Sequence, residues 1–236
     1  MPDWFEDLDR DGFVLLSGVF NPAEMIRAAD DWAAAMATAD ERSILANGGP
    51  AYGARNVLRL WPDVIRLARG ALADALLRVL GPRGGVVRGL YFDKPPGHSW
   101  ALPWHRDTTV AVKAHGRKGV FDKPTVKAGV PHMEAPDGLL TEMITARIHL
   151  DPMTPQNGPL RVAPGTHRTE SAEATEGREV YCEAGDVLLM RPLLLHASGH
   201  SDPTRPLHRR IIHLECAPNP DLSDGYEWHD FRPIRA

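Results

Sequence analysis

Trp104-His105-Arg106-Asp107-Thr108 is the stretch around which the rest of the sequence is organised. In an extended strand, alternate side chains point to opposite faces, so His105 and Asp107 share one face and Arg106 points away. An imidazole and a carboxylate side by side supply two of the three protein ligands in the facial triad that holds non-haem Fe(II). A second histidine is needed on a neighbouring strand, and His196, which follows three leucines, fits that position. His-X-Asp alone is a common pattern, so the metal hypothesis depends on the rest of the chain.

Length, charge and cysteine content restrict the class of protein. The chain has 236 residues, a length that one jelly roll commonly occupies, and its formal net charge of −4 indicates no nucleic-acid or anionic-membrane partner. Two cysteines, Cys182 and Cys216, are too few for a disulfide framework and fit a reducing compartment. The start of the chain lacks the pattern of a signal peptide, and no apolar run approaches the ~20 residues that cross a bilayer. We therefore expect a soluble cytoplasmic protein.

The N-terminal third predicts helices that pack on the outside of a sheet. Residues 11–16 have the pattern of a short strand. Asn21, Pro22 and Glu24 then form a helix start with a capping-box pattern, and the helix is predicted to run to about Ala37. Apolar residues at helical spacing predict a second helix over about 62–80.

From Gly85 onward the chain changes to short strands separated by Gly, Pro and Asp. A run of strands without helix-length segments between them indicates an antiparallel sandwich or jelly roll. The predicted fold class is mostly β with flanking helices, built on a double-stranded β-helix core of the jelly-roll or cupin-like type. The predicted strands cover residues 86–92, 108–113, 143–150, 160–163, 186–190, 193–197 and 209–216.

We predict a single domain over residues 1–236, because no convincing linker interrupts the chain. Residues 1–84 form a mainly helical flank and residues 85–216 the β-helix core. Within the core, residues about 114–140 are polar and rich in Gly and Pro, and a loop this long in a compact domain is either disordered or a functional lid. The tail, residues 217–236, carries Tyr226, Trp228 and Phe231 and is expected to be packed.

Two predicted strands alternate polar and apolar residues. Arg147, His149 and Asp151 share one face of the first strand, and Arg209, Ile211, His213 and Glu215 share one face of the second. Polar side chains on the inner face of a small barrel are costly unless they line a wet functional cavity. A polar face that simply meets solvent is the alternative, and the pattern alone leaves both open.

Five motifs occur in one order along the chain and together resemble the phytanoyl-CoA dioxygenase family of Fe(II)/2-oxoglutarate-dependent oxygenases. The resemblance extends over about residues 85–216, and two of the motifs contain the predicted metal ligands. The motifs are Tyr91-Phe92-Asp93-Lys94-Pro95-Pro96, Leu102-Pro103-Trp104-His105-Arg106-Asp107, Asn157-Gly158-Pro159-Leu160-Arg161-Val162-Ala163-Pro164-Gly165-Thr166-His167, His196-Ala197-Ser198 and Arg209-Arg210-Ile211-Ile212.

The resemblance implies that His105, Asp107 and His196 bind Fe(II) and that 2-oxoglutarate chelates the same iron. The distal carboxylate of 2-oxoglutarate needs a buried cation with two donors in a fork, which an arginine supplies. Arg209 matches the family's arginine. The gap after His196 is slightly longer than the family's usual spacing, so two neighbouring arginines, Arg210 and Arg205, remain alternatives.

Further residues are assigned to the cosubstrate by the same match. Ser198 shares a strand face with His196 and can donate its hydroxyl to the carboxylate, and Lys94 is expected nearby. Arg147 occupies a position where family members can carry an aromatic residue. It is compatible with binding a carboxylate of 2-oxoglutarate or of the substrate, or with a structural ion pair to Asp151 or Glu215.

The function implied by the resemblance is hydroxylation, or a related oxidation, of an unactivated C–H bond in a small organic substrate. O2 is consumed, and 2-oxoglutarate is converted to succinate and CO2. The retained carboxylate of Asp107 favours hydroxylation over halogenation, because halogenating relatives leave that position empty for halide. The alternatives are a cupin-like metalloenzyme that does not use 2-oxoglutarate and a non-catalytic metabolite-binding barrel. The sequence identifies neither the substrate nor the oligomeric state; His132 in the predicted lid is a candidate substrate contact.

Overall fold

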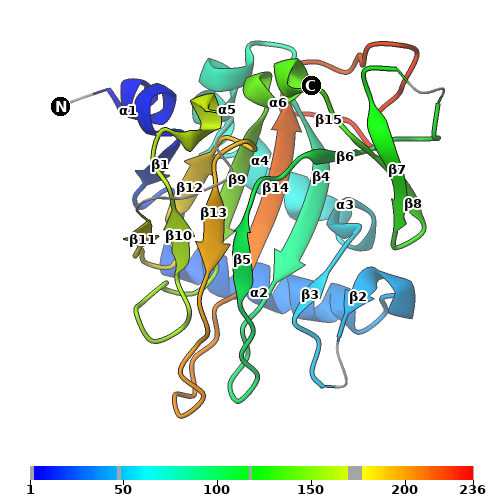
Figure 1. The fold of residues 1–236 in the computed structure, drawn as a ribbon. Coiled ribbons are helices and arrows are strands. Elements are labelled where there is room, and N and C mark those ends of the chain that lie inside the picture. Colours follow the sequence, from blue (N-terminus) through cyan, green and yellow to red (C-terminus); the bar gives the residue numbers. More distant parts are fainter. Residues whose placement is uncertain (1–2, 47–48, 117–118, 170–176, 236) are drawn as a thin grey trace.

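Two antiparallel sheets face each other in the computed structural model, which describes residues 3–46, 49–116, 119–169 and 177–235. The main sheet has the strand order β1-β12-β9-β14-β4-β3-β2, with β15 paired to β4, and the small sheet has the order β11-β10-β13-β5 (Figure 1). This arrangement confirms the predicted jelly-roll class. The main-sheet strands are β1 (Phe13–Leu16), β2 (Ile44–Leu45), β3 (Gly53–Ala54), β4 (Gly85–Phe92), β9 (Ile144–His149), β12 (Val187–Met190), β14 (Ile211–Ala217) and β15 (Arg232–Pro233). The small-sheet strands are β5 (Leu102–His105), β10 (Leu160–Val162), β11 (Arg178–Val180) and β13 (His196–Ser198).

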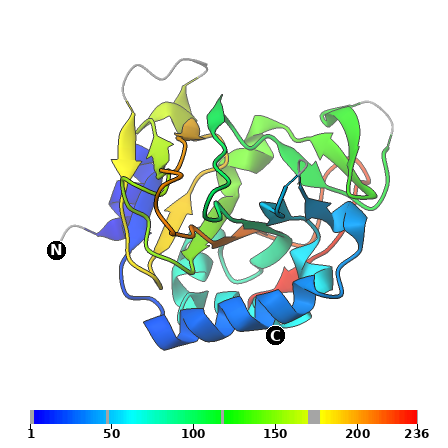
Figure 2. The same ribbon diagram turned by 90° about the horizontal axis from the view of Figure 1, so that it is seen from below.

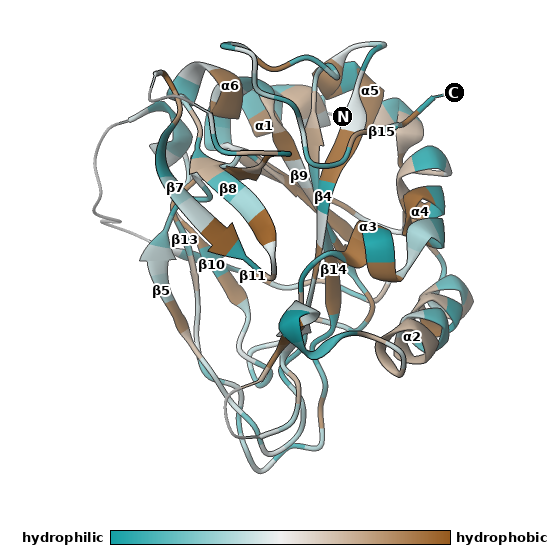
Figure 3. Cartoon of the chain, turned by 90° about the vertical axis from the view of Figure 1, so that its right-hand side faces the viewer, coloured by the Kyte–Doolittle hydropathy of each residue, from teal (hydrophilic) through white to brown (hydrophobic). Residues whose placement is uncertain are grey.

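Helices cover one face of the main sheet. The longest, α2 (Pro22–Met36), begins with the predicted capping box, in which Asn21 and Glu24 exchange side-chain to backbone hydrogen bonds. Figure 2 shows α2 lying beneath the sheet, and Figure 3 shows it beside α3 (Val57–Leu60) and α4 (Ile65–Arg69). One helix, α1 (Trp4–Asp11), was not predicted from the sequence; Asp3 caps its first turn.

The helix predicted over residues 62–80 is broken into three pieces. These are η2 (Pro62–Val64), α4 and α5 (Ala73–Leu80). The break falls at Gly70, whose ψ of −127° lies far from helical values. An apolar stripe at helical spacing does not reveal such a break, because all three pieces bury the same kind of side chain.

The two faces of the main sheet differ in chemistry. The helix-covered face is apolar and packs against α2, α4 and α5 through Ile144, Ala146, Ile148, Val187, Leu189, Ile212 and Leu214. The face turned toward the small sheet carries buried polar residues, namely Thr145, Arg147, His149, His213 and Glu215. A smaller apolar cluster, with Leu160, Val162, Leu188 and Met190, closes one side of the space between the sheets. The polar alternation therefore belongs to an interior face, not to a solvent-exposed one.

Residues 114–140, predicted to be a long loop that is either disordered or a functional lid, largely form regular structure. The segment contains β7 (Asp122–Lys127), β8 (Val130–Glu134) and the start of α6 (Asp137–Glu142), and β8 also pairs with β6 (Thr109–Ala111). Residues 117 and 118 of this segment lie outside the described residues. Most of β7 is exposed, so its sequence lacks the apolar alternation that would have revealed a strand.

The C-terminal tail is packed, as predicted. Tyr226 and Trp228 are buried against the apolar cluster that includes Val110, Phe121 and Met133, and β15 pairs with β4. Residue 236 lies outside the described residues. Within the described residues, no helix combines the length and the apolar character needed to cross a membrane.

Candidate functional site

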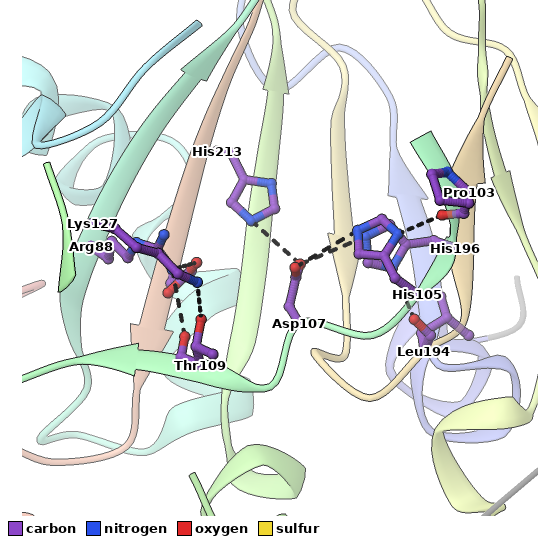
Figure 4. A network of polar contacts seen from close by, with 10 residues as sticks. Arg88, Pro103, His105, Asp107, Thr109, Lys127, Leu194, His196 and His213 are labelled. Atoms are coloured by element: carbon purple, nitrogen blue, oxygen red, sulfur yellow. Dashed lines mark hydrogen bonds and ion pairs between the residues drawn. The ribbon is translucent and has the colours of Figure 1, made fainter. Parts of the chain in front are cut away.

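His105, Asp107 and His196 meet between the two sheets, as the sequence predicted. Paired strands β5 and β13 place His105 directly opposite His196, with ring centroids 4.2 Å apart. The chain turns after β5, where the amide of Asp107 donates to the carbonyl of Pro192. Asp107 Oδ2 lies 3.6 Å from His196 Nε2, and Asp107 Oδ1 lies 4.0 Å from His105 Nε2 (Figure 4).

Backbone carbonyls determine which nitrogen of each imidazole is free. The Nδ1 of His105 lies 2.8 Å from the carbonyl of Pro103, and the Nδ1 of His196 lies 2.9 Å from that of Leu194. A carbonyl only accepts hydrogen bonds, so each Nδ1 carries the hydrogen and each Nε2 keeps its lone pair. Both lone pairs are thus available beside the Asp107 carboxylate, and the three ligand atoms all lie within 4.8 Å of one another. Two neutral imidazoles and one carboxylate fit the donor set of a non-haem Fe(II) site.

The intervening Arg106 points away from this group, as expected. Its Nε donates to the carbonyl of Leu193, and its Nη2 donates to the carbonyls of Thr166 and Thr169. These bonds connect the end of β5 to the segments that contain Leu193 and Thr166. Arg106 therefore supports the position of the strand that carries His105.

A further histidine, His213 on β14, lies against the triad. Its Nε2 is 3.9 Å from Asp107 Oδ2, and neither of its ring nitrogens has a hydrogen-bond partner among the described residues. Burial lowers the pKa of His213 to about 3, so its imidazole is neutral. His213 therefore points inward, which decides between the two directions that the sequence pattern left open. The same holds for His149, which is fully buried and also lacks partners for both ring nitrogens within the described structure.

Three buried basic residues lie close to one another: Lys94, Arg147 and Arg209. We call them the inner cation cluster. Lys94 and Arg209 have no exposed surface, and Arg147 is 6% exposed. Burial lowers the pKa of Lys94 to about 6, with further lowering by the nearby charges of Arg209 and Arg147. No carboxylate forms an ion pair with any of the three within the described part of the chain, so the cluster lacks a counter-charge.

The contacts of Lys94 bring together several of the predicted motifs. Its Nζ donates to the hydroxyl of Ser198 at 3.3 Å and to the carbonyls of Gly158 and Gly199. Gly158 has a φ of +68°, and a Cβ there would lie 2.6 Å from the carbonyl oxygen of Gly199. A larger residue would therefore displace the chain that surrounds the ammonium group.

The three candidate arginines have different environments. Arg210 forms a bidentate ion pair with Asp151, at 2.7 and 2.8 Å, and Arg205 is exposed beside Asp202. The guanidinium of Arg209 is fully buried, and its Nε and Nη1 have no hydrogen-bond partner in the described structure. Burial, reinforced by the charge of Arg147, holds the pKa of Arg209 well below its usual value.

The ion pairs considered for Arg147 do not form. Asp151 pairs with Arg210, and Glu215 pairs with Arg88 at 3.0 Å. Arg147 instead stays beside Arg209, and its Nε has no hydrogen-bond partner among the described residues. Burial lowers the pKa of Arg147 to about 10, so it remains charged at neutral pH.

Trp100 was not predicted from the sequence to lie at this site. Its ring lies 4.8 Å from Lys94 Nζ and 6.0 Å from the guanidinium carbon of Arg209, and its Nε1 donates to the carbonyl of Asp93. The aromatic face covers two charges that have no carboxylate partner. No spacing rule indicated this contact, because Trp100 lies in irregular chain between β4 and β5.

Comparisons with known proteins agree with this arrangement. The family model described as phytanoyl-CoA dioxygenase matches residues 8–207, a span that contains the triad, Lys94 and Ser198 and ends just before Arg209. The ectoine dioxygenase of Sphingopyxis alaskensis is 29% identical over 168 residues, which is 68% of this chain and 48% of that protein. The match thus spans about half the length of that relative.

Solved structures share the fold. The crystal structure of EctD from S. alaskensis with 2-oxoglutarate and 5-hydroxyectoine has a TM-score of 0.69 at 22% identity, covering 90% of this chain and 74% of that one. The α-ketoglutarate-dependent epimerase SnoN from nogalamycin biosynthesis has a TM-score of 0.70 at 15% identity, covering 98% of this chain and 97% of that one. At these identities the likeness shows the fold alone. Because the family model matches most of the chain and includes all three residues of the triad, the chain belongs to the phytanoyl-CoA dioxygenase family.

Proposed function

We propose that this protein is an Fe(II)/2-oxoglutarate-dependent dioxygenase that hydroxylates an unactivated C–H bond of a small organic substrate. The observation that carries the proposal is the position of a complete His-Asp-His donor set next to a buried cation cluster that has no counter-charge. The first feature suits a divalent iron with open coordination positions, and the second suits a dianionic cosubstrate.

Each residue of the site has a role in this proposal. His105, Asp107 and His196 would hold Fe(II), which together with 2-oxoglutarate and O2 supplies the oxidation. Arg209 would bind the distal carboxylate of 2-oxoglutarate, because its Nε and Nη1 are buried and unsatisfied. A carboxylate bound beside Lys94 would favour the protonated form of its amine, and Lys94 would then add a second positive charge near that carboxylate.

Ser198, Arg147 and Trp100 would complete the cosubstrate site. The hydroxyl of Ser198 accepts from Lys94, which leaves its own hydrogen free to donate to a carboxylate oxygen. Arg147, beside Arg209, would add positive charge to the same site, and Trp100 would keep water away from Lys94 and Arg209. Exclusion of water strengthens each of these interactions, because the local dielectric constant falls.

Two other functions are less well supported. A cupin-like metalloenzyme that does not use 2-oxoglutarate has no need of a buried arginine without a partner. A non-catalytic metabolite-binding barrel has no need of three ligand atoms within 4.8 Å of one another.

The test is an anaerobic titration with Fe(II) and 2-oxoglutarate, followed by visible spectroscopy. A metal-to-ligand charge-transfer band is expected only when both are present, and it should be lost in His196→Ala. Admission of O2 with a substrate should then release succinate. Iron binding without the band would favour the cupin-like alternative, and failure to bind iron would favour the binding barrel.

A further inference from the structure

A second group of basic residues lies on the other side of the triad from the inner cation cluster. Arg88 comes from β4, Lys127 ends β7, and Arg55 follows β3. We call these three residues the outer basic cluster. All three are only partly exposed, and Figure 4 shows Arg88 and Lys127 beside Thr109, on one side of Asp107, with His105 and His196 on the other.

Alternation along two strands determines this position. On β14, His213 and Glu215 share the inward face, Arg209 lies two residues before the strand begins, and Glu215 lies opposite Arg88 on β4. His213 contacts Asp107. Glu215 lies two residues beyond His213 on the same strand, roughly 7 Å further along it. Thr109 likewise follows Asp107 by two residues. The outer basic cluster therefore begins one strand repeat beyond the proposed metal site.

Specific contacts hold the cluster together. Arg88 Nη1 donates to Glu215 Oε1 at 3.0 Å and lies 3.5 Å from the carbonyl oxygen of Thr109. Lys127 Nζ donates to Thr109 Oγ1 at 2.8 Å. The charges are close enough to influence one another: burial first, and then the charge of Arg88, lowers the pKa of both Arg55 and Lys127.

The cluster has more positive than negative charge. Glu215 pairs with Arg88, whereas neither Arg55 nor Lys127 forms an ion pair within the described residues. His132 lines one pocket with Arg55 and Arg88, and its Nε2 is buried without a partner in the described structure. A buried donor or acceptor without a partner is costly, and so are partly buried cations without counter-charge. A ligand anion would supply the counter-charge that Arg55 and Lys127 lack. The Nε2 of His132 keeps its lone pair, because its Nδ1 bonds the carbonyl of Val130, and it would accept a hydrogen bond from a donor group of the same ligand.

We propose that the outer basic cluster binds an acidic group of the substrate, a carboxylate or a phosphate, and thereby holds the C–H bond to be oxidised beside the metal site. This inference rests on the proposed function. Arginine suits such groups because its fork of N–H donors matches their oxygens. The proposal also limits the substrate, because its acidic group must reach the outer basic cluster while the carbon to be oxidised lies at the metal site.

The first test measures anion binding without turnover. Inorganic phosphate and acetate are titrated separately against the protein saturated with Fe(II) and 2-oxoglutarate under argon, and the thermal unfolding midpoint is recorded. Arg55→Gln and Lys127→Gln should each weaken the binding of the preferred anion about tenfold. Arg27→Gln, an equal charge change at an exposed position on α2, should leave it unchanged. The anion that binds more tightly shows whether the outer basic cluster prefers a carboxylate or a phosphate.

The second test uses turnover. Matched compounds that differ only in a free acid or its neutral methyl ester are screened by succinate release, and phosphate monoesters form a separate arm. The free acids should stimulate succinate release, and their neutral methyl esters should not. For such a substrate Arg55→Gln should raise KM about tenfold with the KM for 2-oxoglutarate unchanged, and Arg55→Lys should restore part of the loss.

Either of two results would overturn the proposal: equal stimulation by neutral and acidic partners, or unchanged anion affinity in both glutamine variants. Failure of the proposed function has a different signature. The charge-transfer band would then be absent, while the loss of anion binding in Arg55→Gln and Lys127→Gln would still support an anion site at the outer basic cluster.

Discussion

Replacing Arg209 by methionine should change stability and cosubstrate binding in opposite directions. The guanidinium is fully buried, and no carboxylate accompanies it in the described structure. Methionine has a similar length, fills the space and needs no counter-charge. The folded protein without 2-oxoglutarate therefore loses an unfavourable buried charge. The complex with 2-oxoglutarate loses the donor fork that its distal carboxylate requires.

The expected magnitudes follow from the contacts. Hydrogen bonds to charged groups contribute about 1.5–3 kcal/mol each, so loss of a two-donor fork should cost at least about 3 kcal/mol of binding. That corresponds to roughly a hundredfold rise in the Kd for 2-oxoglutarate. Replacement of buried charge by a well-packed apolar residue is often stabilising by about 1–4 kcal/mol, and the same range is expected for the protein without ligand.

Two measurements check this prediction. Urea unfolding without ligand should give a higher free energy of unfolding for Arg209→Met than for the wild type. Anaerobic titration with 2-oxoglutarate in the presence of Fe(II) should give the higher Kd. Arg210→Met is the matched control: it removes the ion pair with Asp151, so it should lower stability and leave 2-oxoglutarate binding nearly unchanged.

The result that refutes the reasoning is an unchanged Kd for 2-oxoglutarate in Arg209→Met together with a large rise in Arg210→Met. The cosubstrate carboxylate would then lie with Arg210, and the buried charge of Arg209 would need another explanation. A marked loss of stability in Arg209→Met would show that the buried guanidinium has protein partners in solution.

Three further predictions concern the metal, the pH dependence and a helix cap. Asp107→Ala should lose most Fe(II) binding, measured by metal content after gel filtration, and all hydroxylation; full turnover would remove Asp107 from the metal site. Because the pKa of Lys94 falls from 10.5 to about 6 on folding, the unfolded chain binds an extra proton between these values, so stability should rise with pH across that window. Lys94→Met should flatten this rise in urea unfolding at pH 6.5 and 9, and an identical slope in both proteins would contradict the assignment. Asn21→Ala should cost about 1 kcal/mol of stability, because one side of the capping box is lost, with no effect on 2-oxoglutarate binding.

Local patterns in the sequence predicted much of the structure. The spacing of His105 and Asp107 predicted that both side chains would reach one site, although Asp107 lies after the end of β5. The two-residue period put His213 and Glu215 on one face of their strand, because that follows from backbone geometry alone. The helix start at Asn21 followed from its side-chain chemistry. In each case the deciding interaction joins residues close together in the chain.

The tertiary structure decided which polar residues meet. The sequence left Arg209, Arg210 and Arg205 as alternatives, because the choice depends on Asp151, which reaches Arg210 from the chain just after β9. The pairing of Glu215 with Arg88 likewise depends on the register between β14 and β4. The sequence contains one indication of the outer basic cluster: Arg88 is a charged residue within an otherwise apolar strand. Arg55 and Lys127 gave none, because they lie beyond the ends or at the margins of short strands and approach Arg88 only through folding. Partners far apart in the chain are selected by strand register and burial, and neither is encoded in any single stretch.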